Sequence, residues 1–435
     1  MCVMHSLIRE CQTGVPDEIK AIARVEDLNS QTLANDIIRG YVSVPSNPRR
    51  KHRICAIGKD CNVKVNVNLG TSAGKCDSAL EIEKAHAAIA AGADTLMDLS
   101  TAGDIPDLRK QVLSLDIPIG TVPIYEAVRR AGTAVDTDAD LLFRVIREHC
   151  HDGVDFLTLH CGVNLEALNA LRLDPRIMGV VSRGGAFHIA RMVQSDEENP
   201  LFAEFEYLLD ILEEYEVVLS LGDGMRPGCI YDAEKLAKST EYLTISKLSK
   251  VALNHGIQRF IEGPGHIPLT QVGYNIRTIK ELTNNAPLYL LGPVVTDLAA
   301  GYDHVAAAIG SAVACMNGAD FLCMISPSEH LALPLVEDIV EGTRVTKIAA
   351  HIGDTVRKGI EWQKNRELPM ARARCNLDWE EQFKQAMFGE LARQIHERDG
   401  KLETCSMCGD LCAIKLVKEI FEKGSQKDKK GKNSE

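Results

Sequence analysis

The chain has 435 residues, with 61 acidic and 49 basic side chains and a formal net charge of −12. This length predicts either one large barrel with an appendage or two to three domains of about 150 residues each. The acidic balance argues against a protein that coats nucleic acid, and no apolar run approaches the roughly 20 residues that cross a membrane. The opening sequence MCVMHSLIRECQTG lacks the apolar stretch of a secretion signal, so we expect a cytoplasmic protein.

Residues 1–60 form a mixed N-terminal segment, helical at 16–40, with a basic patch at 49–53 that we expect to be a solvated loop. From residue 62 on, short runs rich in valine, isoleucine and leucine alternate with helical segments. The runs are 63–69, 94–99, 117–124, 154–160, 177–182, 216–222, 258–262, 287–291 and 319–325. Strands that alternate with helices indicate a parallel sheet, and about eight such units predict an α/β fold, a (β/α)8 TIM-type barrel, over 61–345.

Nine strand-like runs are one too many for an eight-stranded barrel. We expect the run at 287–291, next to Gly292 and Pro293, to be a loop or an extra strand. Beyond the barrel the pattern is helical, which predicts a C-terminal helical domain at 346–423. The lysine-rich tail at 424–435 has the composition of a disordered segment.

Polar residues follow the strand-like runs almost without exception. They are Asn66, Asn68, Asp98, Ser100, Tyr125, His160, Ser182, Arg183, Asp223, Arg226, Glu262, His266, Glu329 and His330. In a barrel the carboxyl ends of all strands meet on one face, and barrel active sites lie on that face. The sequence therefore predicts a functional site there.

Three of these segments suggest particular chemistry, each with a plainer alternative. The SRGG sequence at 182–185 would suit a phosphate, or would be a tight turn with a surface arginine. The DGMRPG sequence at 223–228 offers a carboxylate and an arginine, either for binding or as a salt-bridged loop. His266 and His330 could bind a divalent metal, or could be two hydrogen-bonded histidines.

Fourteen cysteines are many for a chain in a reducing compartment. Eleven are scattered, and we expect most of them to be small core residues. The other three, Cys405, Cys408 and Cys412, lie together near the C-terminus and suit a 4Fe–4S cluster with one iron open to S-adenosylmethionine or substrate. A structural zinc needs four ligands, and His396 is the nearest further candidate. A reactive thiol set is the third possibility.

Several longer strings occur together between about residues 64 and 412. They are MDLST at 97–101, PIGTVPIY at 118–125, VSRGG at 181–185, SLGDG at 220–224, RPG at 226–228, EGPGH at 262–266, GYDH at 301–304, EHLALP at 329–334 and CSMCG at 405–409. On these strings the chain resembles the phosphomethylpyrimidine synthase family of radical S-adenosylmethionine enzymes.

The resemblance implies a (β/α)8 barrel with a C-terminal helical iron–sulfur segment, in a homodimer where that segment serves the partner's barrel. It implies 5-aminoimidazole ribotide as substrate, a 4Fe–4S cluster, S-adenosylmethionine, a divalent zinc or iron ion and an external electron donor, with no nucleic-acid or membrane partner. The implied substrate residues are Asn68, Met97, Tyr125, His160, Ser182, Arg183, Gly184, Asp223, Gly224, Met225, Arg226, Glu262 and Tyr289. His266 and His330 match the family's divalent-metal ligands, and Cys405, Cys408 and Cys412 match its catalytic cluster ligands.

Two departures from the family pattern bear on the product. Three residues separate Cys408 from Cys412 where we expect four, and the first 60 residues lack the expected stretch. These departures favour a paralogue that makes 5-hydroxybenzimidazole, the lower-ligand base of cobamides, from the same ribotide by radical chemistry. The alternative product is the phosphorylated hydroxymethylpyrimidine of thiamine. More distant alternatives are a metal-dependent hydrolase on the same barrel and a non-enzymatic iron–sulfur carrier.

Overall fold

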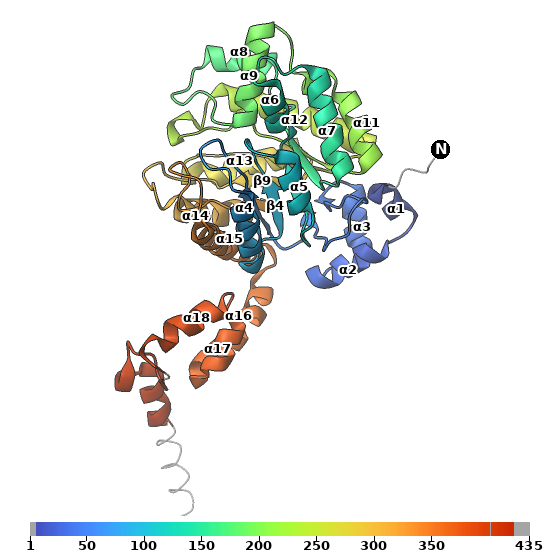
Figure 1. Ribbon diagram of the computed structural model, residues 1–435. Coiled ribbons are helices and arrows are strands. Elements are labelled where there is room, and N and C mark those ends of the chain that lie inside the picture. Colours follow the sequence, from blue (N-terminus) through green and yellow to red (C-terminus); the bar gives the residue numbers. More distant parts are fainter. Residues whose placement is uncertain (1–5, 401, 422–435) are drawn as a thin grey trace, which may run out of the picture. The chain divides into compact units, whose positions relative to one another are not determined.

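The computed structural model describes residues 6–400 and 402–421, and the chain divides into two compact units, Met1–Arg357 and Lys358–Glu435. In the first unit eight parallel strands close into a barrel, in the order β10-β3-β4-β5-β6-β7-β8-β9 (Figure 1). The strands are β3 (Lys64–Leu69), β4 (Thr95–Asp98), β5 (Ile119–Thr121), β6 (Phe156–Leu159), β7 (Val218–Leu221), β8 (Arg259–Glu262), β9 (Leu288–Leu291) and β10 (Phe321–Cys323). The predicted (β/α)8 fold is confirmed.

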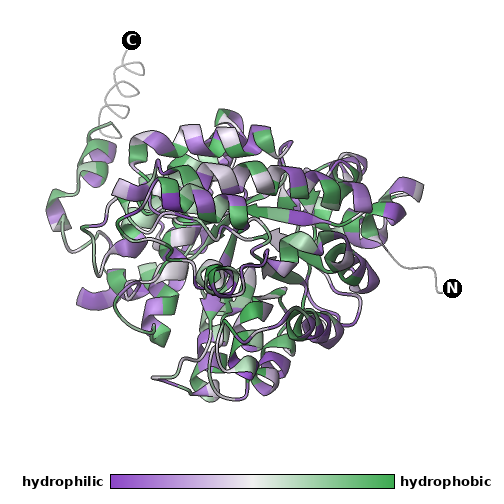
Figure 2. Cartoon of the chain, turned by 90° about the horizontal axis from the view of Figure 1, so that it is seen from above, coloured by the Kyte–Doolittle hydropathy of each residue, from purple (hydrophilic) through white to green (hydrophobic). Residues whose placement is uncertain are grey.

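Helices cover the outside of the barrel. They are α4 (Ser78–Ala90), α5 (Ile105–Leu113), α6 (Pro123–Ala131), α7 (Ala139–Asp152), α8 (Leu165–Leu173), α9 (Arg183–Ser195), α10 (Pro200–Ala203), α11 (Phe205–Tyr215), the short 3-10 helix η1 (Ile230–Asp232), α12 (Leu236–His255), α13 (Leu269–Leu282), α14 (Asp303–Met316) and α15 (Val336–Arg357). Figure 2, which looks from above, shows hydrophilic and hydrophobic residues alternating along these helices. Such a mixture is expected of helices that place one face on a sheet. None of the helices in the described part of the chain has the length and apolar composition of a membrane span.

The surplus strand-like run is 177–182, and our expectation for 287–291 is wrong. Residues 288–291 form β9, which pairs with both β8 and β10 and so belongs to the barrel wall. Residues 177–182 form a loop before α9, in which Ile177, Met178 and Val181 are 71%, 51% and 37% exposed. An apolar run alone does not show whether its side chains are buried.

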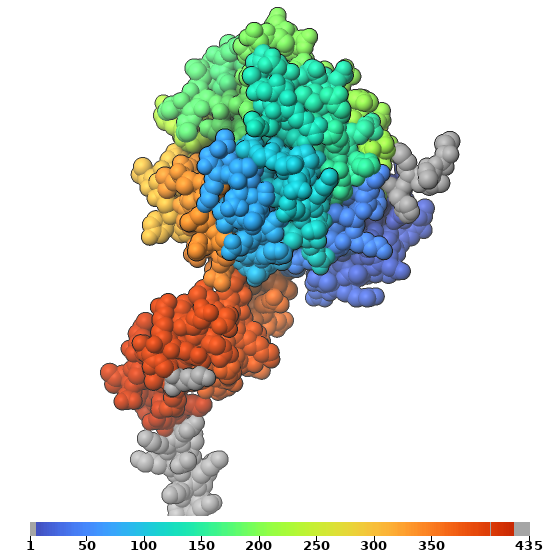
Figure 3. Space-filling model, viewed as in Figure 1, coloured from blue at the N-terminus to red at the C-terminus, as the bar shows by residue number. Residues whose placement is uncertain are grey.

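Three helices precede the barrel and pack on one another. They are α1 (Leu7–Thr13), α2 (Asp17–Glu26) and α3 (Ser30–Ile38), followed by a two-stranded antiparallel sheet of β1 (Val42–Ser43) and β2 (Ile57–Gly58). Leu7, Ile19, Leu33 and Ile37 form a separate apolar cluster, against which Leu253 of α12 packs. Figure 3 shows this segment as a continuous blue block on the barrel unit.

The basic patch at 49–53 is only in part the solvated loop that we expected, since Arg49, Lys51 and Arg53 are exposed but Arg50 and His52 are not. Arg50 and His52 each contact the carboxylate of Asp155, at 2.8 Å, and the side chains of His52 and Asp155 are fully buried. The same carboxylate accepts the backbone N–H groups of Asn47, at 2.8 Å, and Ile119, at 2.7 Å. Since Asp155 directly precedes β6, these contacts bind the N-terminal segment to the start of two barrel strands.

An aromatic layer fills the barrel interior. The rings of Phe156, Phe260 and Phe321 contact one another with centroids 5.5–6.3 Å apart, and all three side chains are fully buried. Gly120 makes room for this layer, because a Cβ atom there would lie 2.2 Å from the Phe156 ring. The layer closes the barrel below the strand ends.

The second unit is helical. It contains α16 (Ile360–Asn376), α17 (Trp379–Gln385), α18 (Gly389–His396) and the short 3-10 helices η2 (Glu397–Asp399) and η3 (Gly409–Leu411). Trp379 stacks on His396 with ring centroids 3.8 Å apart, and its indole N–H donates to the Glu403 carbonyl at 2.9 Å. The tail at 424–435 lies outside the described residues.

We expect Asp155→Ala to lower the free energy of unfolding by about 3–5 kcal/mol, because it leaves the Arg50 guanidinium, the His52 ring and two backbone amides without their acceptor. Urea denaturation followed by circular dichroism measures this. The control is Lys20→Ala, which removes an exposed ion pair of the same 2.8 Å length and should leave stability nearly unchanged. Equal effects of the two variants would contradict the structural role of Asp155.

Candidate functional site

A small cavity of about 70 Å³ lies at the carboxyl ends of the strands. Its lining residues are Asn68, Met97, Leu99, Val122, Tyr125, Thr158, His160, Asp223, Arg226, Glu262, Tyr289, Leu291 and Cys323. A second, wider cavity of about 380 Å³ shares Asn68, Leu99 and Leu291 with it and is also lined by Arg183 and His330. Eight of the thirteen substrate residues implied by the resemblance therefore line one cavity.

The two-residue period of the strands explains why these side chains point inward. On β8, Phe260 belongs to the aromatic layer, and Glu262, two residues later, lines the cavity. On β10, Phe321 and Cys323 have the same relation. The aromatic layer is thus the floor beneath the polar cavity and excludes water from below.

Glu262 is buried in this cavity, where burial raises its pKa more than the positive charge of Arg226 lowers it. Its Oε1 accepts the hydroxyls of Thr158, at 2.8 Å, and Ser220, at 2.6 Å. Burial, followed by the negative charge of Asp223, raises the pKa of Glu262 to about 7. Such a carboxyl can hold or release a proton at physiological pH.

Asp223 and Arg226 lie on the loop after β7 and face the same cavity. The Arg226 guanidinium donates to Asp223 Oδ1 at 2.9 Å. Asp223 is 2% exposed, and among the described residues its Oδ2 has no hydrogen-bond partner. Burial raises the pKa of Asp223, although the contact with Arg226 lowers it. The free oxygen is available to a ligand.

The N-terminus of α9 lies beside His160. Ser182 caps this helix by accepting the N–H of Gly185 at 3.2 Å, and its Oγ lies 3.1 Å from His160 Nε2. A Cβ atom on Gly184 would lie 2.2 Å from the His160 ring, so glycine is required for this close approach. Burial lowers the pKa of His160 well below its usual value, so the ring is neutral. No acidic side chain lies in the first turn of α9, which suits an anion.

Arg183 and Tyr125 stand next to this helix end. The Arg183 guanidinium lies over the Tyr125 ring, 5.0 Å from its centroid, and Phe187 packs edge-on against the same ring. Burial raises the pKa of the Tyr125 phenol, so it stays protonated. The arginine is exposed and can reach toward a ligand.

Gly224 and Met225 lie behind the cavity. A Cβ atom on Gly224 would lie 2.1 Å from Val163, so the loop passes too close for any other residue. The Met225 side chain is fully buried in a cluster with Val163, Ala167 and Met192 and is not among the cavity-lining residues. The N–H of Met225 donates to Glu241 on α12 at 2.9 Å.

A hydrogen-bonded network orients the side chains on the opposite wall. The amide of Asn66 donates to Asn68 and to the Tyr289 hydroxyl, both at 2.8 Å, and the amide of Asn68 donates to the Cys323 sulfur at 3.1 Å. Our sequence reasoning missed Cys323, along with Thr158 and Ser220 beside Glu262. Strict alternation along each strand was the signal that could have found them.

His266 and His330 are brought together, with ring centroids 5.1 Å apart. The Nδ1 atom of His266 lies 2.8 Å from a carboxylate oxygen of Asp297, and burial lowers the pKa of His266. A carboxylate that orients a ligating imidazole is common around protein-bound metals. This donor set fits a divalent metal that keeps positions open for other ligands.

Cys405, Cys408 and Cys412 occupy one loop of the second unit. Hydrogen bonds from the backbone N–H and the thiol of Cys408 lower the pKa of the Cys405 thiol. Backbone hydrogen bonds from Cys408 and Gly409 to the Cys405 carbonyl close the loop. Cys405, Cys408 and Cys412 are the only cysteines that follow Cys375 in the sequence. Three thiol donors in one loop fit a 4Fe–4S cluster with one iron not ligated by the chain.

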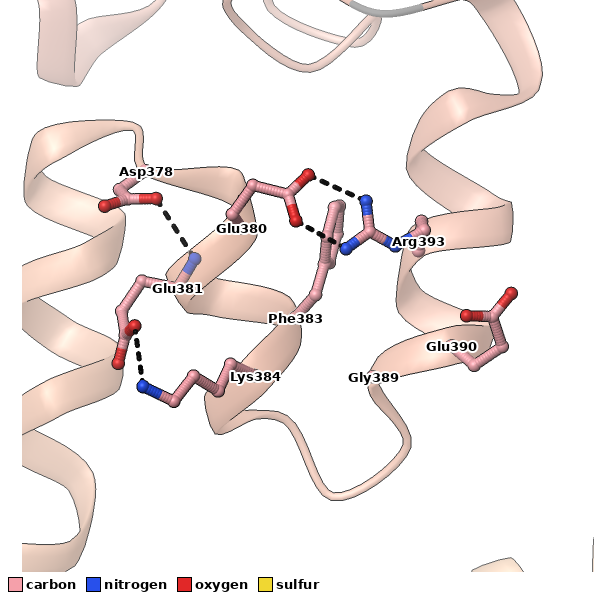
Figure 4. A pocket seen from close by; sticks show the side chains of 8 residues that line it. All are labelled: Asp378, Glu380, Glu381, Phe383, Lys384, Gly389, Glu390 and Arg393. Atoms are coloured by element: carbon pink, nitrogen blue, oxygen red, sulfur yellow. Dashed lines mark hydrogen bonds and ion pairs between the residues drawn. The ribbon is translucent and has the colours of Figure 1, made fainter.

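The second unit also has a groove of about 470 Å³ between α17 and α18. Glu380 and Arg393 face each other there, and both carboxylate oxygens accept from the guanidinium, at 2.7 and 2.6 Å (Figure 4). Asp378, Glu381 and Glu390 add further carboxylates to the lining. We assign this ion-paired groove no part in the site.

Comparison with known proteins identifies related chains. The family model described as "Radical SAM ThiC family" matches residues 6–419. "Phosphomethylpyrimidine synthase 2" from Methanosarcina barkeri is 49% identical over 97% of this chain and 100% of that protein. "Phosphomethylpyrimidine synthase" from Archaeoglobus fulgidus is 50% identical over 96% of this chain and 100% of that protein. A dihydropteroate synthase structure from Coxiella burnetii is similar with a TM-score of 0.40 and 12% identity, over 68% of this chain and 94% of that one.

We expect the stability of wild type, relative to Glu262→Gln, to fall as the pH rises from 5 to 8. The folded chain holds a proton on Glu262 up to a pKa of about 7, whereas the unfolded chain releases it near 4.5. The folded state therefore loses relative stability across this interval, by about 2 kcal/mol, and the neutral amide does not. Urea denaturation of both chains at several pH values measures the difference. Parallel profiles would contradict the raised pKa.

Proposed function

The chain belongs to the radical SAM ThiC family, and from this membership we propose that it converts 5-aminoimidazole ribotide into 4-amino-5-hydroxymethyl-2-methylpyrimidine phosphate, the pyrimidine precursor of thiamine. It is a radical SAM enzyme of the lyase type, and membership of this family implies S-adenosylmethionine and an iron–sulfur cluster. The observation that carries the substrate proposal is the cavity at the barrel mouth. There eight of the implied substrate residues converge above the buried aromatic layer of the barrel.

The relatives bear on the product. Proteins 45–50% identical to this chain carry the name phosphomethylpyrimidine synthase, which favours the thiamine pyrimidine. The 5-hydroxybenzimidazole product that we expected from the cysteine spacing and the N-terminal segment is not supported by these names. It remains the competing outcome in the product assay below.

We assign the phosphate of the ribotide to the N-terminus of α9. Ser182 and Gly184 provide the helix end, and Arg183 provides a positive charge. Asp223 and Glu262 would hold the polar edge of the imidazole through the free Oδ2 and a carboxyl able to donate or accept a proton. Asn68, Met97, Tyr125, His160, Arg226 and Tyr289 would enclose the remainder, with Gly224 and Met225 shaping the loop behind.

The cofactor sites follow from the donor sets. Cys405, Cys408 and Cys412 would hold the 4Fe–4S cluster, and His266 and His330 would hold a divalent zinc or iron ion. When bound, the cluster would supply the one-electron reduction that S-adenosylmethionine chemistry needs, with the electron taken from an external donor. The chain's own residues orient the ribotide and exclude water. The cysteine thiols of the described residues are free.

We also propose that the protein forms a homodimer. The proposal includes neither a nucleic-acid partner nor a membrane partner. Apolar residues are exposed on α14 and α15, with Ile309 and Ile352 51% and 45% accessible. In the cysteine loop, Met407 and Leu411 are 92% and 81% exposed. Exposed apolar surfaces of this kind support contact with a second chain.

One anaerobic reaction tests the proposed function. Reconstituted protein, reductant, S-adenosylmethionine and 5-aminoimidazole ribotide should yield 5′-deoxyadenosine and the phosphorylated hydroxymethylpyrimidine, which mass spectrometry detects. A hydroxybenzimidazole mass would contradict the thiamine assignment, while 5′-deoxyadenosine would still support the radical mechanism. Absence of both products would contradict the substrate and the mechanism together.

We expect Cys408→Ala to lose the iron–sulfur cluster, because two thiols cannot hold a four-iron centre. Iron content and the visible absorption band after anaerobic reconstitution should fall to background. Cys375→Ala is the matched control, since Cys375 is an exposed cysteine of the same unit outside the loop. Equal iron content in the two variants would refute the ligand assignment.

A further inference from the structure

The loop that carries Asp223 and Arg226 is held on its outer side at one residue, Met225. The N–H of Met225 donates to Glu241 Oε2 at 2.9 Å, and the carbonyl of Met225 accepts from the Arg176 guanidinium at 2.7 Å. The same guanidinium lies 3.4 Å from the Arg226 carbonyl. Both polar ends of the Met225 backbone are therefore fixed by side chains from outside the loop.

The two holding side chains come from separate parts of the barrel unit and are buried. Glu241 lies on α12 and is 0% exposed, and Arg176 lies between α8 and α9 and is 9% exposed. Neither side chain lines the cavity at the strand ends. Since they lie outside that lining, their contacts are with the loop and not with the cavity.

The glycine at the centre of the loop brings Glu241 close to the site. A Cβ atom on Gly224 would lie 3.3 Å from Glu241 Oε1. In the described structure Glu241 Oε1 and Asp223 Oδ2 are both buried and lack a hydrogen-bond partner. Burial and the charge of Asp223 raise the pKa of Glu241 well above its usual value, so Glu241 is a neutral acid. A neutral Glu241 leaves Asp223 free to pair with Arg226.

We propose that Glu241 is the positioning residue of this site, clamping the Met225 backbone together with Arg176 so that Asp223 and Arg226 face the ligand cavity. The substrate part of this inference rests on the proposed function, whereas the clamp itself does not. A fixed backbone matters here because a ligand gains from Asp223 and Arg226 only when their positions are set before binding.

The clamp has a test that needs no ligand. In Glu241→Ala the Met225 N–H loses its acceptor, so hydrogen–deuterium exchange of a peptide spanning 222–227 should speed up at least tenfold. Glu241→Gln keeps a neutral acceptor and should restore protection to within about threefold of wild type. Ser249→Ala is the control, because Ser249 is buried on the same helix but bonds Arg259 instead. Unchanged exchange in Glu241→Ala, or equal exchange in the Ala and Gln variants, would overturn the clamp.

The second arm measures affinity for 5-aminoimidazole ribotide by calorimetry, with the full-length, cluster-loaded protein and no S-adenosylmethionine. We expect a Kd at least tenfold weaker in Glu241→Ala, about 1.4 kcal/mol, and near wild type in Glu241→Gln and Ser249→Ala. If Glu241→Ala fails to fold, Arg176→Met removes the carbonyl half of the clamp and should weaken binding similarly. A wild-type affinity in the variant that folds would overturn the positioning role. No binding by wild type would instead contradict the proposed function.

Discussion

The burial of the Glu262 carboxyl at the centre of the barrel is the constraint on which the site depends. The aromatic layer beneath it excludes water, and the hydroxyls of Thr158 and Ser220 satisfy one of its oxygens without supplying a charge. A carboxyl in such a place favours its protonated form, and the nearby Asp223 strengthens that preference. The barrel therefore holds a protonated Glu262 carboxyl beside the position where a polar ligand would lie.

The remaining parts of the site can be understood as supports for this arrangement. Glycines at 184 and 224 let α9 and the loop after β7 approach more closely than a side chain would allow. Glu241 and Arg176 hold that loop at the backbone of Met225, so that Asp223 keeps one oxygen for Arg226 and one for a ligand. The ligand-facing groups thus depend on buried polar residues that never reach the cavity.

Much of the fold could be predicted from the sequence, because strands and helices alternate with clear periods. The surplus strand was misplaced because hydrophobicity alone does not separate the exposed Ile177 from the buried residues of β9. The basic patch was misjudged because its partner Asp155 lies about 100 residues away in the sequence. Six of the eight predicted cavity-lining residues were expected on this face because they are polar and follow strand-like runs, and the motif resemblance added Met97 and Tyr289. Cys323 follows from the alternation along β10, but the supporting Glu241 depends on how α12 packs against the loop after β7, which no local string reveals.

A crystal structure of the protein with 5-aminoimidazole ribotide would show where this ligand binds on the barrel. We expect the phosphate to lie at the N-terminus of α9, against Ser182 and Gly184, and the imidazole to lie between Asp223 and Glu262. Electron density for the phosphate at any other place on the barrel would contradict the account. So would an empty cavity at a ribotide concentration that saturates binding in solution.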